Sequence, residues 1–266
     1  MKSHLSITQN NMQWVYCYCW FYEYLSNDKK LLFISLLDEF INSKKFEGIG
    51  IELTDEIKVS IGGWAVLLVL NLPLGINLFR HIDVIFVHPG THVNREDTFG
   101  LIKGISHYCH IHLAWGCIRD VDTKKTHEGN SILHEFSHAL DFIDRHFNGV
   151  PSTLLPKKAL YSWNKVFHGK FFQSMSKEQG EILWQYFELD NWNEFEKDNL
   201  SKSGVAELFS VSTEKYFENP LELRRYSPNI YSCLARLYGV NINENTRKNN
   251  KLLSAILDYL NVGKRT

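Results

Sequence analysis

The amino-acid sequence predicts an α+β fold that is mainly helical and carries one small mixed β-sheet. Three observations predict it. Apolar residues recur at helical spacing along most of the chain, and two short stretches are typical of strands, one rich in β-branched residues and one with imperfect alternation. The segment around residues 129–144 is apolar nearly all round, as a buried helix is. With 266 residues, 44% of them hydrophobic, the chain can bury a sizeable core.

The elements follow from these patterns and from the turn residues between them. The expected helices lie at residues 28–41, 54–70, 129–144, 157–172, 177–188, 204–217, 229–239 and 250–261. Gly62 and Gly63 interrupt the second of these patterns. The expected strands lie at residues 81–88 and 110–119. The expected loops, polar or rich in Gly and Pro, lie at residues 1–12, 44–50, 71–77, 91–103, 122–129, 148–151 and 189–199.

Short polar residues stand where three of the helices should begin. Ser26 or Asn27 can cap the first helix, and Asn130 or Ser131 can cap the helix at 129–144. Ser203 is the expected cap of the helix at 204–217. We expect three parts: an N-terminal extension (1–27), a main domain (28–245) and a C-terminal helix and tail (246–266).

Composition favours a cytoplasmic protein that binds neither nucleic acid nor membrane directly. The net charge is -1 and the sequence pI about 6.9, so no global charge attracts nucleic acid. The five cysteines form no CxxC pair and no even disulfide set, which indicates reduced thiols. No signal-peptide layout is visible, and the longest apolar run, residues 64–72, is too short to span a bilayer.

The strongest chemical pattern is His134-Glu135-Phe136-Ser137-His138, an HExxH sequence on a predicted helix. Two imidazoles four residues apart lie one turn apart on the same face, so both can reach one metal ion. Glu135 is offset by about a third of a turn, where it can act as general base on a metal-bound water. This is the arrangement of a zinc peptidase, which needs one further ligand.

The third ligand has to come from downstream. A metzincin would need Gly at position 141 and His at 144, and both positions hold aspartate. Glu207 is the best candidate because its neighbours Ala206 and Leu208 suggest an inward side chain, which zinc would neutralise. The other downstream acids stand in polar or mixed surroundings that suit a solvated carboxylate: Glu181, Glu188, Glu194, Glu196 and Glu218. His127 and His146 are expected to be surface histidines.

Two further carboxylates could orient a ligand imidazole by accepting a hydrogen bond from its ring nitrogen that does not bind the metal. Asp141 lies three residues after His138, and Glu214 lies seven residues after Glu207 on the same helical face. An ordinary salt bridge explains either of them equally well.

With these residues in place, the chain resembles the Mlc titration factor A (MtfA) family of zinc peptidases over roughly residues 35–240. The resemblance rests on several separated segments in the right order: 45–48, 65–72, 84–89, 112–115, 130–141, 149–151 and 206–220. The catalytic domain of anthrax lethal factor is similar in a more distant way. The resemblance implies a gluzincin-type metallopeptidase domain, with His134, His138 and Glu207 as zinc ligands and Glu135 as the base.

The same resemblance implies an exopeptidase-like, aminopeptidase-like activity on short peptides and binding of a transcriptional repressor. It also implies that the strand at 110–119 lies beside the cleft, where an extended substrate could pair with it. One position departs from the family: Leu200 stands where a tyrosine that stabilises the oxyanion is expected. Tyr216 or Tyr226 could supply that hydroxyl instead.

Three functions therefore remain open. The first is a zinc peptidase acting on a peptide or protein substrate. The second is a regulatory protein that binds a transcriptional regulator and uses zinc mainly as a structural ion. The third is a helical scaffold without metal.

Overall fold

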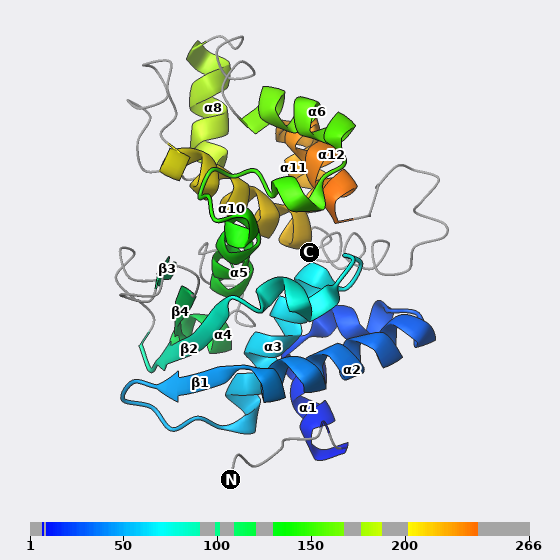
Figure 1. The fold of residues 1–266 in the computed structure, drawn as a ribbon, viewed down its shortest axis with the longest axis vertical. Helices are drawn as coiled ribbons and strands as arrows, with labels where there is room; N and C mark the ends of the chain where they lie inside the picture. Colours follow the sequence, from blue (N-terminus) through cyan, green and yellow to red (C-terminus); the bar gives the residue numbers. More distant parts are fainter. Residues whose placement is uncertain are drawn as a thin grey trace, which may run out of the picture. The chain divides into compact units, whose positions relative to one another are not determined.

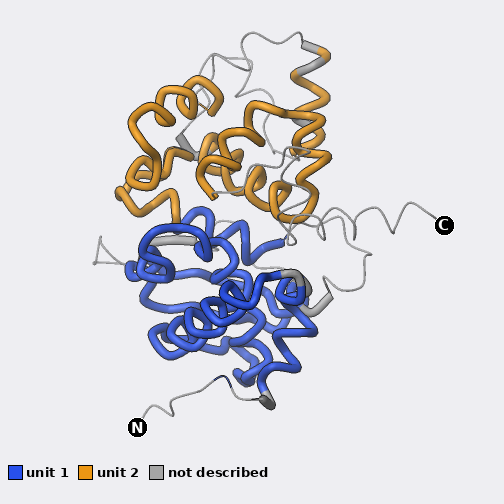
Figure 2. Tube along the Cα trace, turned by 90° about the vertical axis from the view of Figure 1, so that its right-hand side faces the viewer, with its two compact units in different colours: residues 1–139 blue, residues 140–266 orange. Residues whose placement is uncertain are grey.

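The structure is a computed structural model that describes residues 7, 9–90, 99–101, 109–120, 130–167, 177–187 and 202–238. The chain forms two compact units, residues 1–139 and 140–266 (Figure 2). The expected loops at 122–129 and 189–199 and the expected helix at 250–261 lie outside the described residues. The expected boundaries after residues 27 and 245 stay predictions.

The first unit joins a bundle of helices to a small sheet (Figure 1). Its elements are α1 (Gln9–Tyr18), η1 (Trp20–Tyr24), α2 (Asn27–Ser43), β1 (Lys45–Gly48), α3 (Asp55–Val69), η2 (Gly75–Phe79), β2 (Ile82–His88), β3 (Phe99–Leu101), β4 (Cys109–Ala114), α4 (Trp115–Asp120) and most of α5 (Ser131–Asp141). The caps confirm the predicted starts, because Ser26 accepts a hydrogen bond from the Lys29 amide and Thr54 accepts one from Ile57. Helix α1 begins at Gln9, inside the segment expected to be loose.

The two glycines that interrupt the pattern of α3 are sites of close packing. A Cβ at Gly63 would lie 2.1 Å from the Cys19 Sγ, and one at Gly62 would lie 2.7 Å from a Leu37 methyl. The helix therefore continues through both glycines, since the missing side chains let its neighbours approach.

The sheet is mixed, as predicted, with the order β1-β2-β4-β3. Strands β1, β2 and β4 are parallel, and β3 pairs antiparallel with β4. Strands β1 and β3 were not predicted, because both lie in expected loops, at residues 44–50 and 91–103. The predicted strand at 110–119 is too long, because β4 ends at Ala114 and α4 follows at once. Strand β3 pairs with β4 along Cys109–Ile111, and pairing of an extended substrate with β4 stays a prediction.

Helix α5 is fixed in the first unit by an aromatic cluster. Phe136 packs against Phe79 of η2, with ring centroids 4.9 Å apart, and against Phe40 of α2 at 5.7 Å. All three rings are fully buried. Each such ring contributes roughly 1.5–3 kcal/mol of burial free energy, so this contact sets how α5 is oriented.

All regular elements in the described residues of the second unit are helices. Its elements are η5 (Phe142–Asp144), η6 (Ser152–Leu154), α6 (Lys157–Phe167), α8 (Lys177–Phe187), α10 (Lys202–Glu218), α11 (Pro220–Tyr226) and α12 (Pro228–Leu237). Trp163 and Phe167 of α6 pack on Phe209 of α10. The structure corrects two details: Ser203 lies inside α10 instead of capping it, and α11, with Pro220 at its start, was not predicted. None of the helices in the described segments is both long and apolar enough to cross a bilayer.

His81, between η2 and β2, is a half-buried histidine whose pKa departs from the ordinary value. Burial and the nearby Lys44 cation lower the pKa of His81 to about 4, although its ring also hydrogen-bonds to the backbone at Ala139 of α5 and at Leu78. The ring is therefore neutral at pH 7. In the unfolded chain a histidine has a pKa of about 6.5.

This difference predicts an acid-dependent loss of stability. Between pH 6.5 and 4 the unfolded chain binds a proton that the folded chain does not, so stability falls as the pH falls across that window. The loss should reach up to about 3 kcal/mol. Urea unfolding from pH 7 to 4, with chelator present throughout, should show a shallower pH dependence for His81→Gln than for the parent. Parallel curves would contradict the assignment.

Candidate metal centre

The local sequence explains why α5 forms and where it begins. The Asn130 side-chain oxygen accepts hydrogen bonds from the amides of Ile132 and Leu133, both at 3.1 Å, so Asn130 is the cap. Ser137 does not break the helix because its hydroxyl donates to the Leu133 carbonyl at 2.6 Å. The predicted burial is confirmed on the apolar face, which is formed by Ile132, Leu133, Phe136, Ala139 and Leu140.

The two predicted imidazoles converge on one side of α5. The His134 Nε2 and the His138 Nε2 lie 3.2 Å apart, and the rings meet at an interplanar angle of 76°. His138 is buried and His134 is half-buried. The spacing of the motif therefore gives the geometry that the sequence predicted.

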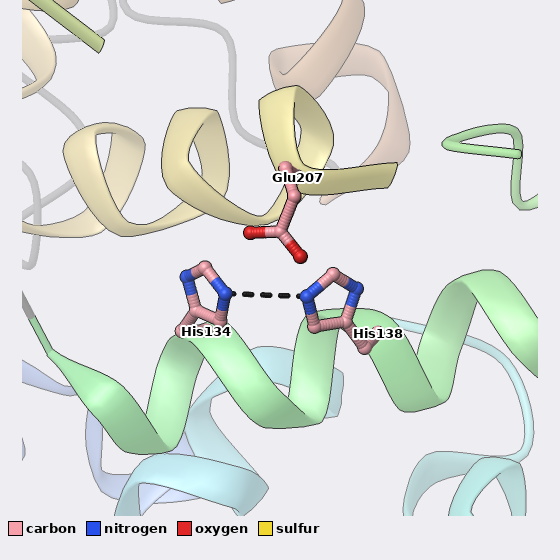
Figure 3. Close-up of side chains that lie close together, drawn as sticks. All are labelled: His134, His138 and Glu207. Carbon is pink, nitrogen blue, oxygen red and sulfur yellow. Dashed lines mark hydrogen bonds between the residues drawn. The ribbon is translucent and has the colours of Figure 1, made fainter. Parts of the chain in front are cut away.

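Glu207 of α10 completes a group of three donors. One ligand atom each from His134, His138 and Glu207 all lie within 4.8 Å of one another, and Figure 3 shows the Glu207 carboxylate directed at both rings. Glu207 is exposed, so the expected burial of its side chain is wrong. Its neighbours Ala206 and Leu208 are buried, but they point about 100° to either side of it around the helix.

The donor set and its spacing fit a zinc-like ion. Two nitrogens bound to tetrahedral zinc at 2.0–2.1 Å lie about 3.3 Å from each other. The observed 3.2 Å between the two Nε2 atoms is close to that value. Two imidazoles and one carboxylate also leave one position of a four-coordinate ion for another molecule, as catalytic zinc sites do.

Asp141, at the end of α5, holds the chain that follows the helix. Its carboxylate accepts backbone hydrogen bonds from the amides of Asn148, Gly149 and Val150, each at 2.8 Å. Sequence reasoning missed this role, because it depends on a turn seven to nine residues away. The predicted interaction of Asp141 with a ligand imidazole stays a prediction.

The turn held by Asp141 lies directly against α10. A Cβ at Gly149 would lie 2.5 Å from the Val205 carbonyl oxygen, and the Gly149 carbonyl accepts a hydrogen bond from Trp163 Nε1 at 2.7 Å. Gly149 also has a φ of +67°, which favours glycine. Val205 is two residues before Glu207. These contacts connect the end of α5 to the part of α10 that carries the carboxylate.

Two other predicted carboxylates, Glu135 and Glu214, are buried. Glu135 is 5% exposed on α5. Glu214 is 7% exposed on α10, two turns after Glu207. Their predicted roles, as base and as outer partner of an imidazole, stay predictions. His146 is exposed and hydrogen-bonds Asp144, in agreement with a surface histidine.

Tyr216, one of the two tyrosines considered as a hydrogen-bond donor to the oxyanion, is a core residue. It is 3% exposed and packs against Tyr231 and Tyr238. It also lies nine residues, or about 13 Å along α10, from Glu207. Burial raises its pKa well above 10, so it stays a neutral core residue. Tyr226 is exposed at the end of α11 and stacks on Tyr186, and Leu200 lies outside the described residues.

Comparison with known proteins agrees with this geometry. A family model described as glucose-regulated metallo-peptidase M90 matches residues 2–239. A curated relative, Mlc titration factor A of Pectobacterium atrosepticum, is 26% identical over 229 residues, which cover 80% of each chain. The resemblance inferred from the separated motifs is thereby confirmed.

The close contact at Gly149 predicts a pair of contrasting alanine variants. Gly50 also has a positive φ, but nothing lies within 4 Å of the position that a Cβ would take there, so Gly50→Ala should cost only the backbone strain of about 1–2 kcal/mol. Gly149→Ala should lose about 1–3 kcal/mol more, because the new methyl overlaps the Val205 carbonyl. Urea unfolding of both variants measures the difference. Equal losses would show that the contact is unimportant.

The three-donor group predicts which carboxylate controls metal affinity. Glu207→Gln should weaken zinc binding by more than the roughly 10- to 100-fold that loss of an outer partner costs. Glu181→Gln, which changes an exposed carboxylate on α8, is the matched control and should bind zinc as the parent does. Competition with a chromophoric chelator measures both affinities. Unchanged binding in Glu207→Gln would exclude it as a ligand.

Proposed function

Because the chain belongs to the glucose-regulated metallo-peptidase family M90, we propose that it is a zinc-dependent peptidase acting on a peptide or protein substrate. The observation that carries the proposal is the convergence of His134, His138 and Glu207 within 4.8 Å. These three side chains are the proposed ligands. The donor types, two imidazoles and one carboxylate, are those of hydrolytic zinc sites.

In the proposed reaction the protein groups have separate tasks. Zinc, when bound, would polarise the peptide carbonyl and make water a stronger nucleophile at neutral pH. Glu135 accepts a proton from the attacking water and delivers it to the leaving amine, so one carboxylate serves as base and then as acid. Two observations support this role. Glu135 is buried, and the aromatic contact of the neighbouring Phe136 fixes the helix that carries it.

The surrounding carboxylates are proposed to hold the ligands in place. Glu214 is buried on the helix that carries Glu207 and would accept a hydrogen bond from a ligand imidazole. Asp141 would do so in addition to organising the turn at 148–150. Tyr226 is the remaining candidate for the oxyanion, because Tyr216 is buried in the core of the second unit.

The runner-up function is a regulatory binding protein in which zinc is mainly structural. Two observations favour it. The curated relative is named as a titration factor, which suggests a protein partner for this chain as well. Leu200 replaces the expected tyrosine, and loss of one oxyanion donor costs about 100- to 1,000-fold in rate. Digestion of a peptide library with and without chelator separates the two: activity abolished by chelator supports the enzyme, and none in either condition supports the binder.

The assigned base can be tested without disturbing the ligands. Glu135→Gln should lower the rate of peptide hydrolysis by about 100- to 10,000-fold, because the amide cannot accept the proton. Its zinc content, measured by elemental analysis, should equal that of the parent. Glu39→Gln, an exposed change on α2, controls for the loss of a charge. If Glu135→Gln cleaves peptides as fast as the parent, the mechanism is wrong.

A further inference from the structure

Helix α6 in the second unit carries an exposed basic face. The buried side of this helix holds Trp163, Val166 and Phe167. The opposite side carries five exposed residues: Lys157, Lys158, Tyr161, Asn164 and Lys165. Tyr161 is 78% exposed, more than any other large hydrophobic side chain in the described residues. Tyrosine is enriched at protein interfaces because it combines a large apolar ring with a hydroxyl group.

The charges of this face are not compensated within the described part of the chain. Helix α6 has no acidic residue, and Lys157 and Lys158 stand in its first turn. Cations are unfavourable there, because the N-terminal end of a helix dipole is positive. None of the acidic side chains in the described segments forms an ion pair with either of these lysines or with Lys165. A negative surface placed against α6 would therefore be attracted both by the lysines and by the helix dipole.

Helix α8 of the same unit presents an exposed face of the opposite charge. Its buried side holds Gly180, Leu183 and Phe187. Its exposed side carries an acidic and partly apolar group of residues: Glu178, Glu181, Ile182 and Gln185. Ile182 is 46% exposed. Each of the two faces thus places one large apolar side chain beside charges of a single sign, which is positive on α6 and negative on α8.

The spacing of the two faces lets them pair along their length. Lys158 lies three residues before Tyr161, and Lys165 lies four residues after it. On α8, Glu178 lies four residues before Ile182. When Tyr161 lies against Ile182, Glu178 is therefore opposite Lys158 if the helices are parallel and opposite Lys165 if they are antiparallel. Either direction places an apolar contact beside a pair of opposite charges.

We propose that α6 of one molecule packs along α8 of a second copy of this chain. Charge complementarity selects this occupant, because each copy carries both faces and one contact compensates both. The net charge of -1 leaves little general repulsion between copies. Exposed ion pairs each add little affinity, so the association is reversible and depends on protein concentration. The proposal is independent of the peptidase function, because neither helix carries a proposed zinc ligand.

The test is sedimentation velocity of the full-length protein at increasing protein concentration. The parent should self-associate at low salt, and high salt should weaken the association because it screens exposed charges. Lys158→Glu combined with Lys165→Glu should weaken self-association by at least about 10-fold, because like charges then face each other. Glu178→Lys combined with Glu181→Lys should do the same. An equimolar mixture of the two double variants should recover association, because each offers a face that complements the other.

A matched control and the mixture make the result decisive. Arg80→Glu combined with Arg225→Glu makes the same change of net charge as the α6 variant, at exposed positions outside both helices, and should leave association unchanged. Circular dichroism should show that every variant is folded. A parent that stays monomeric at every concentration and salt would overturn the proposal, whatever the variants do. So would association that persists unchanged in either folded charge variant, or a mixture of the two that does not recover it.

Discussion

The burial of α5 is the constraint on which the structure depends. This helix must lie in the core, because its apolar side carries Phe136 and four other buried side chains. It also carries Glu135 and His138, each less than a tenth exposed. Ionisable groups are costly in such a place unless something compensates them. A metal ion held by the two imidazoles is the compensation that the donor set fits.

Backbone contacts that follow the motif organise the turn next to α10. Asp141 ends α5 and fixes the amides of residues 148–150, and the turn so formed meets α10 at Val205. Glycine is required at 149, both for its positive φ and for the close approach. Within the second unit, these contacts link Asp141 to the part of α10 that precedes Glu207.

The sequence predicted the helices well, because capping residues and apolar periodicity are local signals. Ser26, Thr54 and Asn130 stand where the structure places α2, α3 and α5. Strand β1 was missed because its four residues, mostly polar or small, become a strand only by pairing with β2. The predicted strand at 110–119 was too long because apolar residues continue past the end of β4 into α4. Such errors arise where pairing or packing, and not the local pattern, decides the structure.

The three donors that the structure groups were named from the sequence, but the argument that selected Glu207 was partly wrong. HExxH fixes two donors by helical spacing, and Glu207 does reach them. However, Glu207 is exposed, and the flanking apolar residues that suggested it lie on other sides of α10. The role of Gly149 required the fold itself, because a contact made by a turn cannot be read from spacing.

The most direct measurement is anomalous diffraction from crystals of the zinc-loaded protein, collected on both sides of the zinc absorption edge. The account predicts that the strongest peak lies about 2.0–2.2 Å from the Nε2 atoms of His134 and His138 and from one Glu207 oxygen. A zinc peak bound by the two imidazoles with Glu207 turned away would contradict it. So would the absence of any zinc peak between them.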